Sequence, residues 1–265
     1  MTCSALYGRA TLGNLQTDLR FLESLGLFAE IYLSAELLDA LDRETLSHML
    51  RWREEGRELT FHAPFVDLSP GGQDPKVLEI TRYRFSQVMD LAGRVQPSQI
   101  LFHPGFDKWR FGFREDLWIE NSAPIWSEVL NQAERCRVRV VLENVFDPRP
   151  DHLGKLREKV GSELGFCLDT GHLILFSEVS LERWLDVFGD GLRELHLHDN
   201  DGSRDLHLPV GEGIFDFQGL FHKVESRGAD TVVVLEHHTQ TKTRKSLENF
   251  QRLLEGISSH DGSHS

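Results

Sequence analysis

The sequence has few of the residues that crosslink a chain or break it into segments. Of its 265 residues, three are cysteine and nine are proline. Cys3, Cys136 and Cys167 form no Cys-x-x-Cys pair, so we expect reduced thiols in a cytoplasmic protein rather than a disulfide scaffold. No apolar run approaches the roughly 18 residues of a membrane span. The first residues also lack the basic and apolar regions of a signal peptide.

Positive charge is scarce as well. Lys and Arg number 29 against 42 Asp and Glu, which gives a formal net charge of −13. Such a surface has no general attraction for nucleic acid or for anionic membranes, so the charge argues against both as partners. Cations bound among the carboxylates would make the working charge less negative. The 13 histidines are an unusual number, and their positions carry the functional interpretation.

Short runs of β-branched and other apolar residues alternate with stretches of helical period along the chain. Seven such runs are typical of strands buried on both faces, and the segment around Tyr7 is a weaker eighth candidate. One-sided apolar spacing marks the helices between them, as with Leu15, Leu19 and Leu22. Eight strand–helix units in about 250 residues predict a (β/α)8 barrel. The seven strand runs are 29–33, 59–62, 99–103, 138–143, 165–169, 192–198 and 231–236.

No linker rich in proline, glycine and serine interrupts this alternation. We therefore expect one α/β domain, a single TIM barrel over residues 1–257, followed by a polar, disordered tail at 258–265. The main alternative is an open doubly wound sheet. That fold usually carries a glycine-rich phosphate loop after its first strand, and Gly8 and Gly13 do not form one.

Nearly every expected strand ends on a histidine or a carboxylate. In a barrel the C-terminal ends of the strands open on one face, where active sites are built. One such residue alone is more often a solvated loop residue or a helix cap. Here six strands end on His, Asp or Glu and none of the six on Lys, Arg, Ser or Asn, which indicates a shared function instead. The six are His62, His103, Glu143, Asp169, His196 and Glu236.

These groups predict a divalent metal site, because clustered buried carboxylates would repel one another without cations among them. Local spacing adds three more. His172 follows Asp169 across Gly171, which would permit a tight turn, and Asp205 and His207 share one side of an extended loop. Imidazole and carboxylate ligands together suit Zn, Mn, Co or Fe rather than Ca. Nine groups exceed the need of one ion, so we expect one to three ions, with other groups serving as acid, base or substrate contacts.

The ordered series of motifs resembles the xylose isomerase-like TIM-barrel superfamily. This superfamily includes sugar phosphate isomerases and epimerases as well as endonuclease IV. The resemblance therefore implies the barrel fold but not one activity. The motifs are His-Ala-Pro-Phe at 62–65, Phe-His-Pro-Gly at 102–105, Leu-Glu-Asn at 142–144, Cys-Leu-Asp-Thr-Gly-His at 167–172, His-Leu-His-Asp-Asn-Asp at 196–201 and Leu-Pro-Val-Gly-Glu-Gly at 208–213.

Two branches of the superfamily use these positions differently. Similarity to ketose 3-epimerases implies one metal, held by Glu143, Asp169, His196 and Glu236. There the two glutamates also act as catalytic acid and base, and His172 contacts the substrate. Similarity to endonuclease IV implies three metals held by nine matching residues. These are His62, His103, Glu143, Asp169, His172, His196, Asp205, His207 and Glu236.

Departures from the endonuclease IV pattern favour the first branch. That pattern usually has Tyr where this chain has Phe65, and Cys where it has Gly171. A Thr-Ala-Gly stretch usually follows Glu-Asn, whereas Val-Phe-Asp follows here. The expected rim also lacks the Lys or Arg cluster that would grip DNA phosphates. Acidic residues lie near it instead: Asp67, Asp74 and Asp147.

We therefore expect a divalent-metal-dependent isomerase or epimerase acting on a sugar, a sugar phosphate or a polyol. Glu143 and Glu236 would move protons through an enediolate-type step beside the metal. The alternative is a trinuclear, endonuclease IV-like phosphodiesterase that cleaves at abasic sites. A non-enzymatic sugar-binding barrel would not need so many charged groups on one rim. The residues expected to contact substrate are His62, His103, His172 and Arg204.

Overall fold

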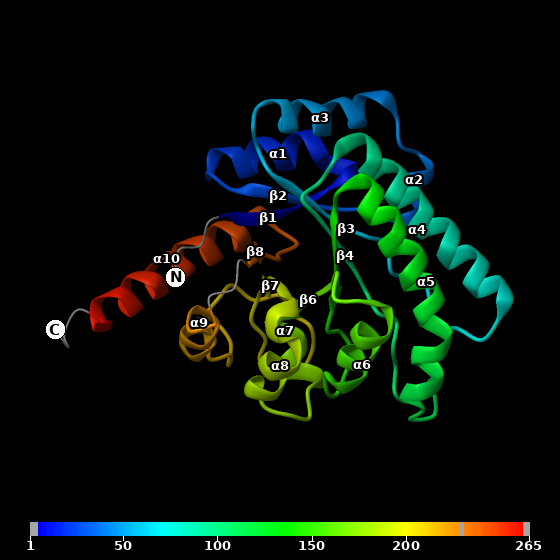
Figure 1. Cartoon of the computed structure of the whole chain (residues 1–265). Coiled ribbons are helices and arrows are strands. Elements are labelled where there is room, and N and C mark those ends of the chain that lie inside the picture. Colours follow the sequence, from blue (N-terminus) through cyan, green and yellow to red (C-terminus); the bar gives the residue numbers. More distant parts are fainter. Residues whose placement is uncertain (1–4, 228–230, 262–265) are drawn as a thin grey trace.

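Eight parallel strands close into a barrel in sequence order, from β1 to β8 (Figure 1). The computed structural model describes residues 5–227 and 231–261. β1 pairs with β8, which closes the barrel and confirms the (β/α)8 prediction. The segment around Tyr7 is β1, and the seven other runs match strands to within one residue at each end. The strands are β1 Leu6–Thr11, β2 Phe28–Tyr32, β3 Leu59–His62, β4 Gln99–Phe102, β5 Arg139–Glu143, β6 Leu164–Asp169, β7 Leu192–Leu197 and β8 Val232–Leu235.

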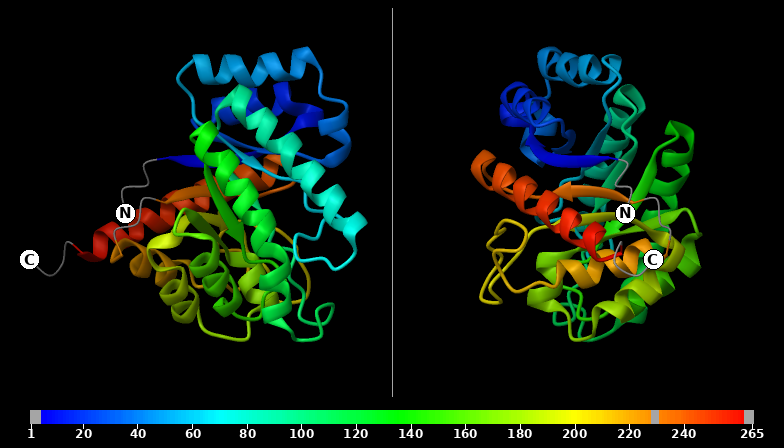
Figure 2. Two further views of the ribbon diagram at one scale, coloured as in Figure 1. Left: turned by 45° about the vertical axis from the view of Figure 1, so that its right-hand side comes forward. Right: turned by 90° about the vertical axis from the view of Figure 1, so that its left-hand side faces the viewer.

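Helices surround the strands on the outside of the barrel (Figure 2). Asp74 caps the start of α4, where its side chain accepts a hydrogen bond from the Lys76 N–H, and Pro75 takes the first helical position. Among the described residues, none of the helices combines the length and the apolar character that a membrane span requires. The α-helices are α1 Leu15–Ser24, α2 Ala35–Asp39, α3 Arg43–Glu54, α4 Pro75–Val95, α5 Glu115–Cys136, α6 Asp151–Val160, α7 Thr170–Phe176, α8 Leu181–Phe188, α9 Phe217–Glu225 and α10 Gln240–Asp261. The 3-10 helices are η1 Leu12–Asn14 and η2 Gly189–Gly191.

The sequence predicts a disordered tail at 258–265 and reduced cysteines. α10 runs to Asp261, so it enters the segment 258–265 for which the sequence predicts a disordered tail. Residues 262–265 lie outside the described part of the chain. Cys136 and Cys167 are free thiols, as expected, and Cys3 lies outside the described residues.

The core consists of an outer layer between strands and helices and an inner layer inside the barrel. In the outer layer, Phe102 directly contacts Phe85 of α4 and Trp126 of α5 from its place in β4, with ring centroids 4.7 and 5.8 Å away. In the inner layer, Leu101, Val141 and Cys167 from β4, β5 and β6 form a small apolar cluster. Leu101 thus faces the barrel interior and Phe102 faces the helices, because successive side chains of a strand point to opposite faces.

The inner apolar cluster is the floor of the functional site. Because side chains alternate along a strand, the residue two positions further on faces the same interior. Two positions after Val141 comes Glu143, and two positions after Cys167 comes Asp169. Glu143 and Asp169 therefore lie above this small buried apolar cluster, at the C-terminal end of the barrel.

We expect Trp126→Ala to lower the free energy of unfolding by about 3–5 kcal/mol, the usual cost of truncating a core aromatic residue. Trp126 is fully buried against Phe85 and Phe102. Trp109 is 73% exposed and supplies a matched control, for which we expect a change below about 0.5 kcal/mol. Urea unfolding followed by circular dichroism measures both variants. Equal losses in the two would contradict the packing described.

Candidate metal centre

All nine predicted ligands converge at the C-terminal end of the barrel. Seven of them are buried, His103 is partly exposed and Asp205 is exposed. They fall into overlapping groups whose nitrogen and oxygen atoms lie within ligand distance of one another. His62, Glu143, Asp169 and His196 lie in β3, β5, β6 and β7, His103 and Glu236 directly follow β4 and β8, His172 lies in α7, and Asp205 and His207 lie in the loop before α9.

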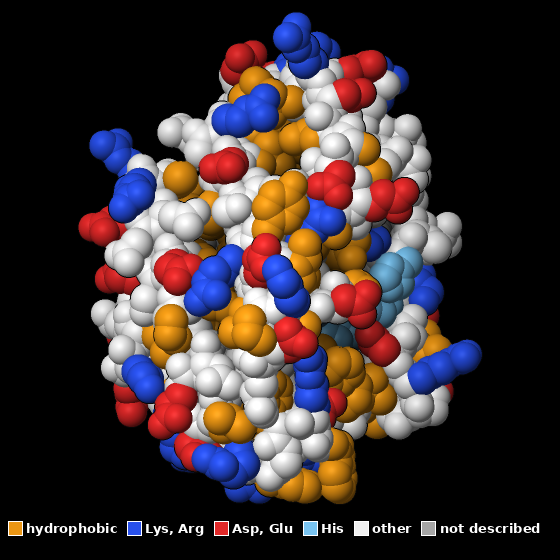
Figure 3. Space-filling model, turned by 90° about the vertical axis from the view of Figure 1, so that its right-hand side faces the viewer, with side chains coloured by type: hydrophobic (Ala, Val, Ile, Leu, Met, Phe, Trp, Pro, Cys, Tyr) orange, Lys and Arg blue, Asp and Glu red, His pale blue; other side chains and the backbone are white. Residues whose placement is uncertain are grey.

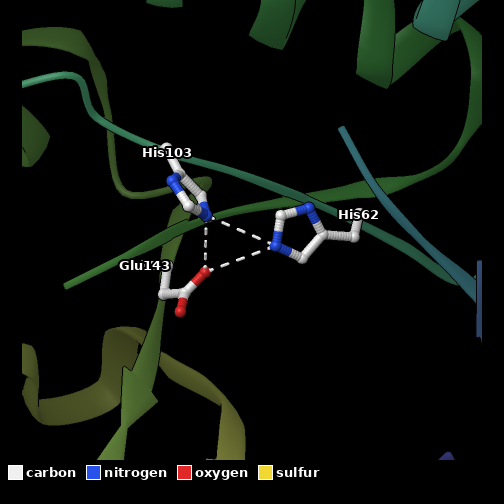
Figure 4. A group of neighbouring side chains, drawn as sticks. All are labelled: His62, His103 and Glu143. Atoms are coloured by element: carbon white, nitrogen blue, oxygen red, sulfur yellow. Dashed lines mark hydrogen bonds and ion pairs between the residues drawn. The ribbon is translucent and has the colours of Figure 1, made fainter. Parts of the chain in front are cut away.

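The first group consists of His62, His103 and Glu143, whose polar atoms point at one another (Figure 4). Glu143 Oε2 lies 3.0 Å from His103 Nε2 and 3.6 Å from His62 Nε2, and the two nitrogens are 3.3 Å apart. Ligands of one zinc ion, each about 2.1 Å from the metal in a tetrahedron, are about 3.4 Å apart. The three atoms therefore have the spacing of ligands around one ion.

The second group shares Glu143 with the first. His196 Nδ1 lies 3.2 Å from Glu236 Oε2, 3.7 Å from Glu143 Oε1 and 3.9 Å from Asp169 Oδ2. Glu143 thus presents Oε2 to the two histidines of the first group and Oε1 to the second group. A carboxylate in this position can bridge two ions.

A third group forms around Asp205. Its Oδ2 lies 3.0 Å from His207 Nε2 and 3.7 Å from His172 Nε2. His207 reaches this position with a left-handed backbone, at φ 45°, and not from the extended loop that the sequence predicts. The Nδ1 atoms of His207 and His172 contact the carbonyl oxygens of Glu236 and Asn144, which turns the Nε2 atoms toward Asp205.

His198 is a residue of the site that sequence analysis left without a role. It is fully buried, and its Nε2 lies 2.9 Å from Asp169 Oδ2. The space it occupies explains Gly171, because a Cβ there would lie only 2.0 Å from the His198 ring. Gly171 lies in the first turn of α7 and not in a separate tight turn, but Asp169 and His172 do converge, with Asp169 Oδ1 3.4 Å from His172 Nδ1. Asp169 caps α7 and accepts a hydrogen bond from the His172 N–H at 2.6 Å.

The buried carboxylates of the site need positive charge beside them to remain ionised. Burial opposes ionisation of Glu143, but the charges of His103 and His196 outweigh it and hold the pKa of Glu143 well below its usual value. Burial likewise opposes a charged His172, yet Asp169 and Asp205 raise the pKa of His172 well above its usual value. Protonated imidazoles therefore balance the carboxylates in the metal-free protein. A divalent ion would displace those protons.

A cavity of about 290 Å³ lies over these groups. The predicted substrate contacts His62, His103 and His172 line it, whereas Arg204 lies on an exposed loop and is not among the described lining residues. Four other residues of the lining were not among the predicted site residues: Arg9, Tyr32, Phe65 and His238. Tyr32 ends β2 just as the predicted residues end their strands, so the strand-end pattern could have included it. The Arg9 guanidinium lies 4.9 Å from the centre of the Tyr32 ring.

A second cavity of about 350 Å³ adjoins the first, and Phe65 and His103 line both. Phe65 stacks on the His103 ring with centroids 3.9 Å apart. The second cavity is mostly apolar, with Asp67, Asp107 and Arg110 as its charged lining residues among those described. Figure 3 shows histidine side chains at one side of a face of the molecule, between acidic and hydrophobic side chains.

The sequence matches the family described as xylose isomerase-like TIM barrel over residues 30–255. TTHB071 protein from Thermus thermophilus, in a structure obtained by soaking with ZnCl2, is 28% identical, with a TM-score of 0.79 over 94% of this chain and 97% of that chain. A D-tagatose 3-epimerase-like protein is 21% identical, with a TM-score of 0.84 over 97% and 99% of the two chains. Endonuclease IV from Thermus thermophilus is 19% identical, with a TM-score of 0.71 over 94% and 99%. The last two likenesses show the fold alone.

We expect Gly171→Ala to destabilise the protein by about 1–3 kcal/mol, because the new Cβ must displace the His198 ring. Adding His198→Ala should restore part of the loss by removing the obstacle. Thermal unfolding of the two single variants and the double variant measures the coupling. Additive losses would show that Gly171 and His198 do not compete for the same space.

Proposed function

We propose that this chain, which belongs to the xylose isomerase-like TIM-barrel family, is a divalent-metal-dependent isomerase or epimerase of a small sugar-like molecule. The observation that carries the proposal is the cavity over Glu143 and Glu236. At about 290 Å³ it is near the lower end of ligand sites, which range roughly from 300 to 1,000 Å³. Polar side chains dominate its lining, as a polyhydroxylated substrate requires. Its size suits a monosaccharide rather than a polymer.

The residues present fit a divalent ion. Glu143 Oε2 is buried and has no hydrogen-bond partner among the described residues, although two imidazole nitrogens face it. Glu143, Asp169, His196 and Glu236 would hold an ion at the substrate end of the barrel. When bound, such an ion supplies a Lewis acid that polarises a carbonyl oxygen. The zinc soak of the Thermus thermophilus relative makes zinc the first ion to test.

Glu143 and Glu236 would exchange protons with the substrate carbon next to that carbonyl. Burial works against their ionisation, but the His196 charge helps to lower the pKa of both carboxyls well below the usual value. Each is therefore ionised at neutral pH and available as a base. One glutamate would take the proton from one face of the carbon, and the other, carrying a proton, would deliver it to the opposite face, which inverts the carbon. His172, held through Nδ1 by the Asn144 carbonyl, can orient a substrate hydroxyl.

A trinuclear phosphodiesterase is the second candidate, and the bridging position of Glu143 favours it. Nine converging ligands exceed what a one-metal isomerase uses. The walls of the site weigh against it. Among the described residues that line the two adjoining cavities, Arg9 and Arg110 are the only Lys or Arg, and Phe146 and Asp67 stand beside them. A DNA-binding face needs several cations against phosphates.

We expect the purified protein, expressed with Zn or Mn, to contain at least one ion per chain by elemental analysis. Glu143→Gln and Glu236→Gln should each abolish epimerisation of ketoses, followed by chromatography of the sugar products, because each removes a proton acceptor. Glu248→Gln, on the exposed face of α10, is the control and should keep full turnover. Wild-type turnover in either site variant would remove that glutamate from the mechanism.

His103→Ala separates the two candidate functions. In a one-metal isomerase His103 contacts substrate, so the variant should keep its ion and show mainly a raised KM. In a trinuclear phosphodiesterase the same change removes a ligand, so metal content and cleavage of an abasic-site oligonucleotide should fall together. We expect the first result. A wild-type protein with three ions that nicks the oligonucleotide, with both properties lost in the variant, would establish the second function instead.

A further inference from the structure

Two carboxylates lie behind His196, on the side of its ring that faces away from the candidate metal ligands. Glu30 comes from β2 and Glu194 from β7, and both are buried inside the barrel. His196 Nε2 lies 3.2 Å from Glu30 Oε1 and 3.4 Å from Glu194 Oε1. The other ring nitrogen, Nδ1, faces the carboxylates of the second group described above.

The two carboxylates are held in this orientation by their other oxygens. Glu194 Oε2 accepts a hydrogen bond from Gln99 Nε2 at 2.6 Å, and Glu30 Oε2 accepts one from Thr60 Oγ1 at 3.2 Å. Glu30 Oε1, Glu194 Oε1 and His196 Nε2 have no hydrogen-bond partner among the described residues, and only the two ion-pair distances given above link them. Three buried polar atoms are thus left facing one another.

Stability of the fold alone does not account for this arrangement. Burying a carboxylate is costly unless it is paired, and an apolar residue of similar volume would serve a barrel core as well or better. The ion pairs of Glu30 and Glu194 among the described residues are all with His196. Local conflicts of this kind are expected at functional positions.

The position of the proton on the His196 ring accounts for Glu30 and Glu194. The partner of one ring nitrogen decides which nitrogen carries the proton, and therefore which one offers its lone pair to a metal. His62 and His207 each direct Nδ1 to a backbone carbonyl and Nε2 to the site. His196 is turned the other way round, and its Nε2 points into the barrel, where strand carbonyls are occupied by neighbouring strands.

We propose that Glu30 and Glu194 are positioning residues that keep the proton of His196 on Nε2, so that its Nδ1 lone pair faces the bound ion. The inference rests on the metal-dependent function proposed above. The negative charge of Glu30 also makes the imidazole a stronger donor to the ion. Because two carboxylates share one N–H, each can substitute in part for the other.

The test compares metal affinity with the state of the imidazole. Glu30→Met, Glu194→Met and the double variant remove the acceptors while conserving volume. Glu30→Gln and Glu194→Gln keep an acceptor but remove its charge, and they serve where a Met variant does not fold. We expect the double Met variant to bind Zn about 10–100-fold more weakly in competition with a chromophoric chelator, and the Gln variants to lie in between.

The imidazole is observed by 15N NMR of histidine-labelled protein without metal. A charged imidazole carries protons on both nitrogens, so the spectra are recorded at a pH high enough for His196 to be neutral. There the wild type should keep the proton of His196 on Nε2, and the double Met variant should show a shift of the proton toward Nδ1. Asp147→Asn is the matched control. Asp147 is a buried carboxylate 2.7 Å from the buried His152, outside the metal groups, so the change should lower stability but not zinc affinity.

The possible failures are distinguishable. A wild-type protein that binds no ion would refute the proposed function, while the NMR of the metal-free protein would still test the positioning role. Unchanged zinc affinity and an unchanged proton position in the double variant would overturn the inference. Loss of one whole ion in Cys167→Ser would also overturn it, because Glu194 and Cys167 would then be ligands of their own ion beside His196.

Discussion

The site depends on the two oxygens of Glu143, which face different neighbours. Oε2 faces His62 and His103, and Oε1 faces His172 and His196. This is possible because Glu143 ends β5 above the inner apolar cluster, where β4 and β6 on either side bring their own end residues to the same height. The closed barrel therefore assembles, from residues far apart in sequence, a cluster that no single loop could hold in place.

The alternation of short apolar runs with amphipathic stretches was sufficient to predict the closed barrel, since both periods are properties of the local sequence. Six of the nine candidate ligands were predictable because parallel strands must deliver their last residues to one rim, and local spacing added the other three. Glu30 and Glu194 were harder to interpret. They lie inside strands, where a charged residue marks a conflict with burial but does not name its partner, and Glu30 meets His196 only through closure of the barrel.

His198 and Gly171 illustrate a second limit of sequence reasoning. A glycine between Asp169 and His172 suggested a turn, because local chemistry offers that explanation first. The actual reason is steric and non-local: the ring of a residue one strand away fills the volume of the missing side chain. A single sequence cannot reveal that the His198 ring fills the space of a missing side chain at Gly171, because neither residue is unusual when considered alone. It becomes visible only when the strands that carry them are placed side by side.

The buried carboxylates of the site lie at two levels. Glu30 and Glu194 form the lower level, the candidate metal ligands form the upper level, and the negative charge of each level must be balanced by positive charge. Neutral histidines cannot compensate the carboxylates that meet here, so protons or metal ions must do so. Burial and the neighbouring Glu30 raise the pKa of Glu194 to about 8, which places a proton in the lower level at neutral pH. In the upper level, depressed carboxyl pKa values and the raised pKa of His172 place protons on imidazoles instead. Metal ions would replace the upper protons and leave the lower one, so the lower level can hold His196 steady while the upper level exchanges its cations.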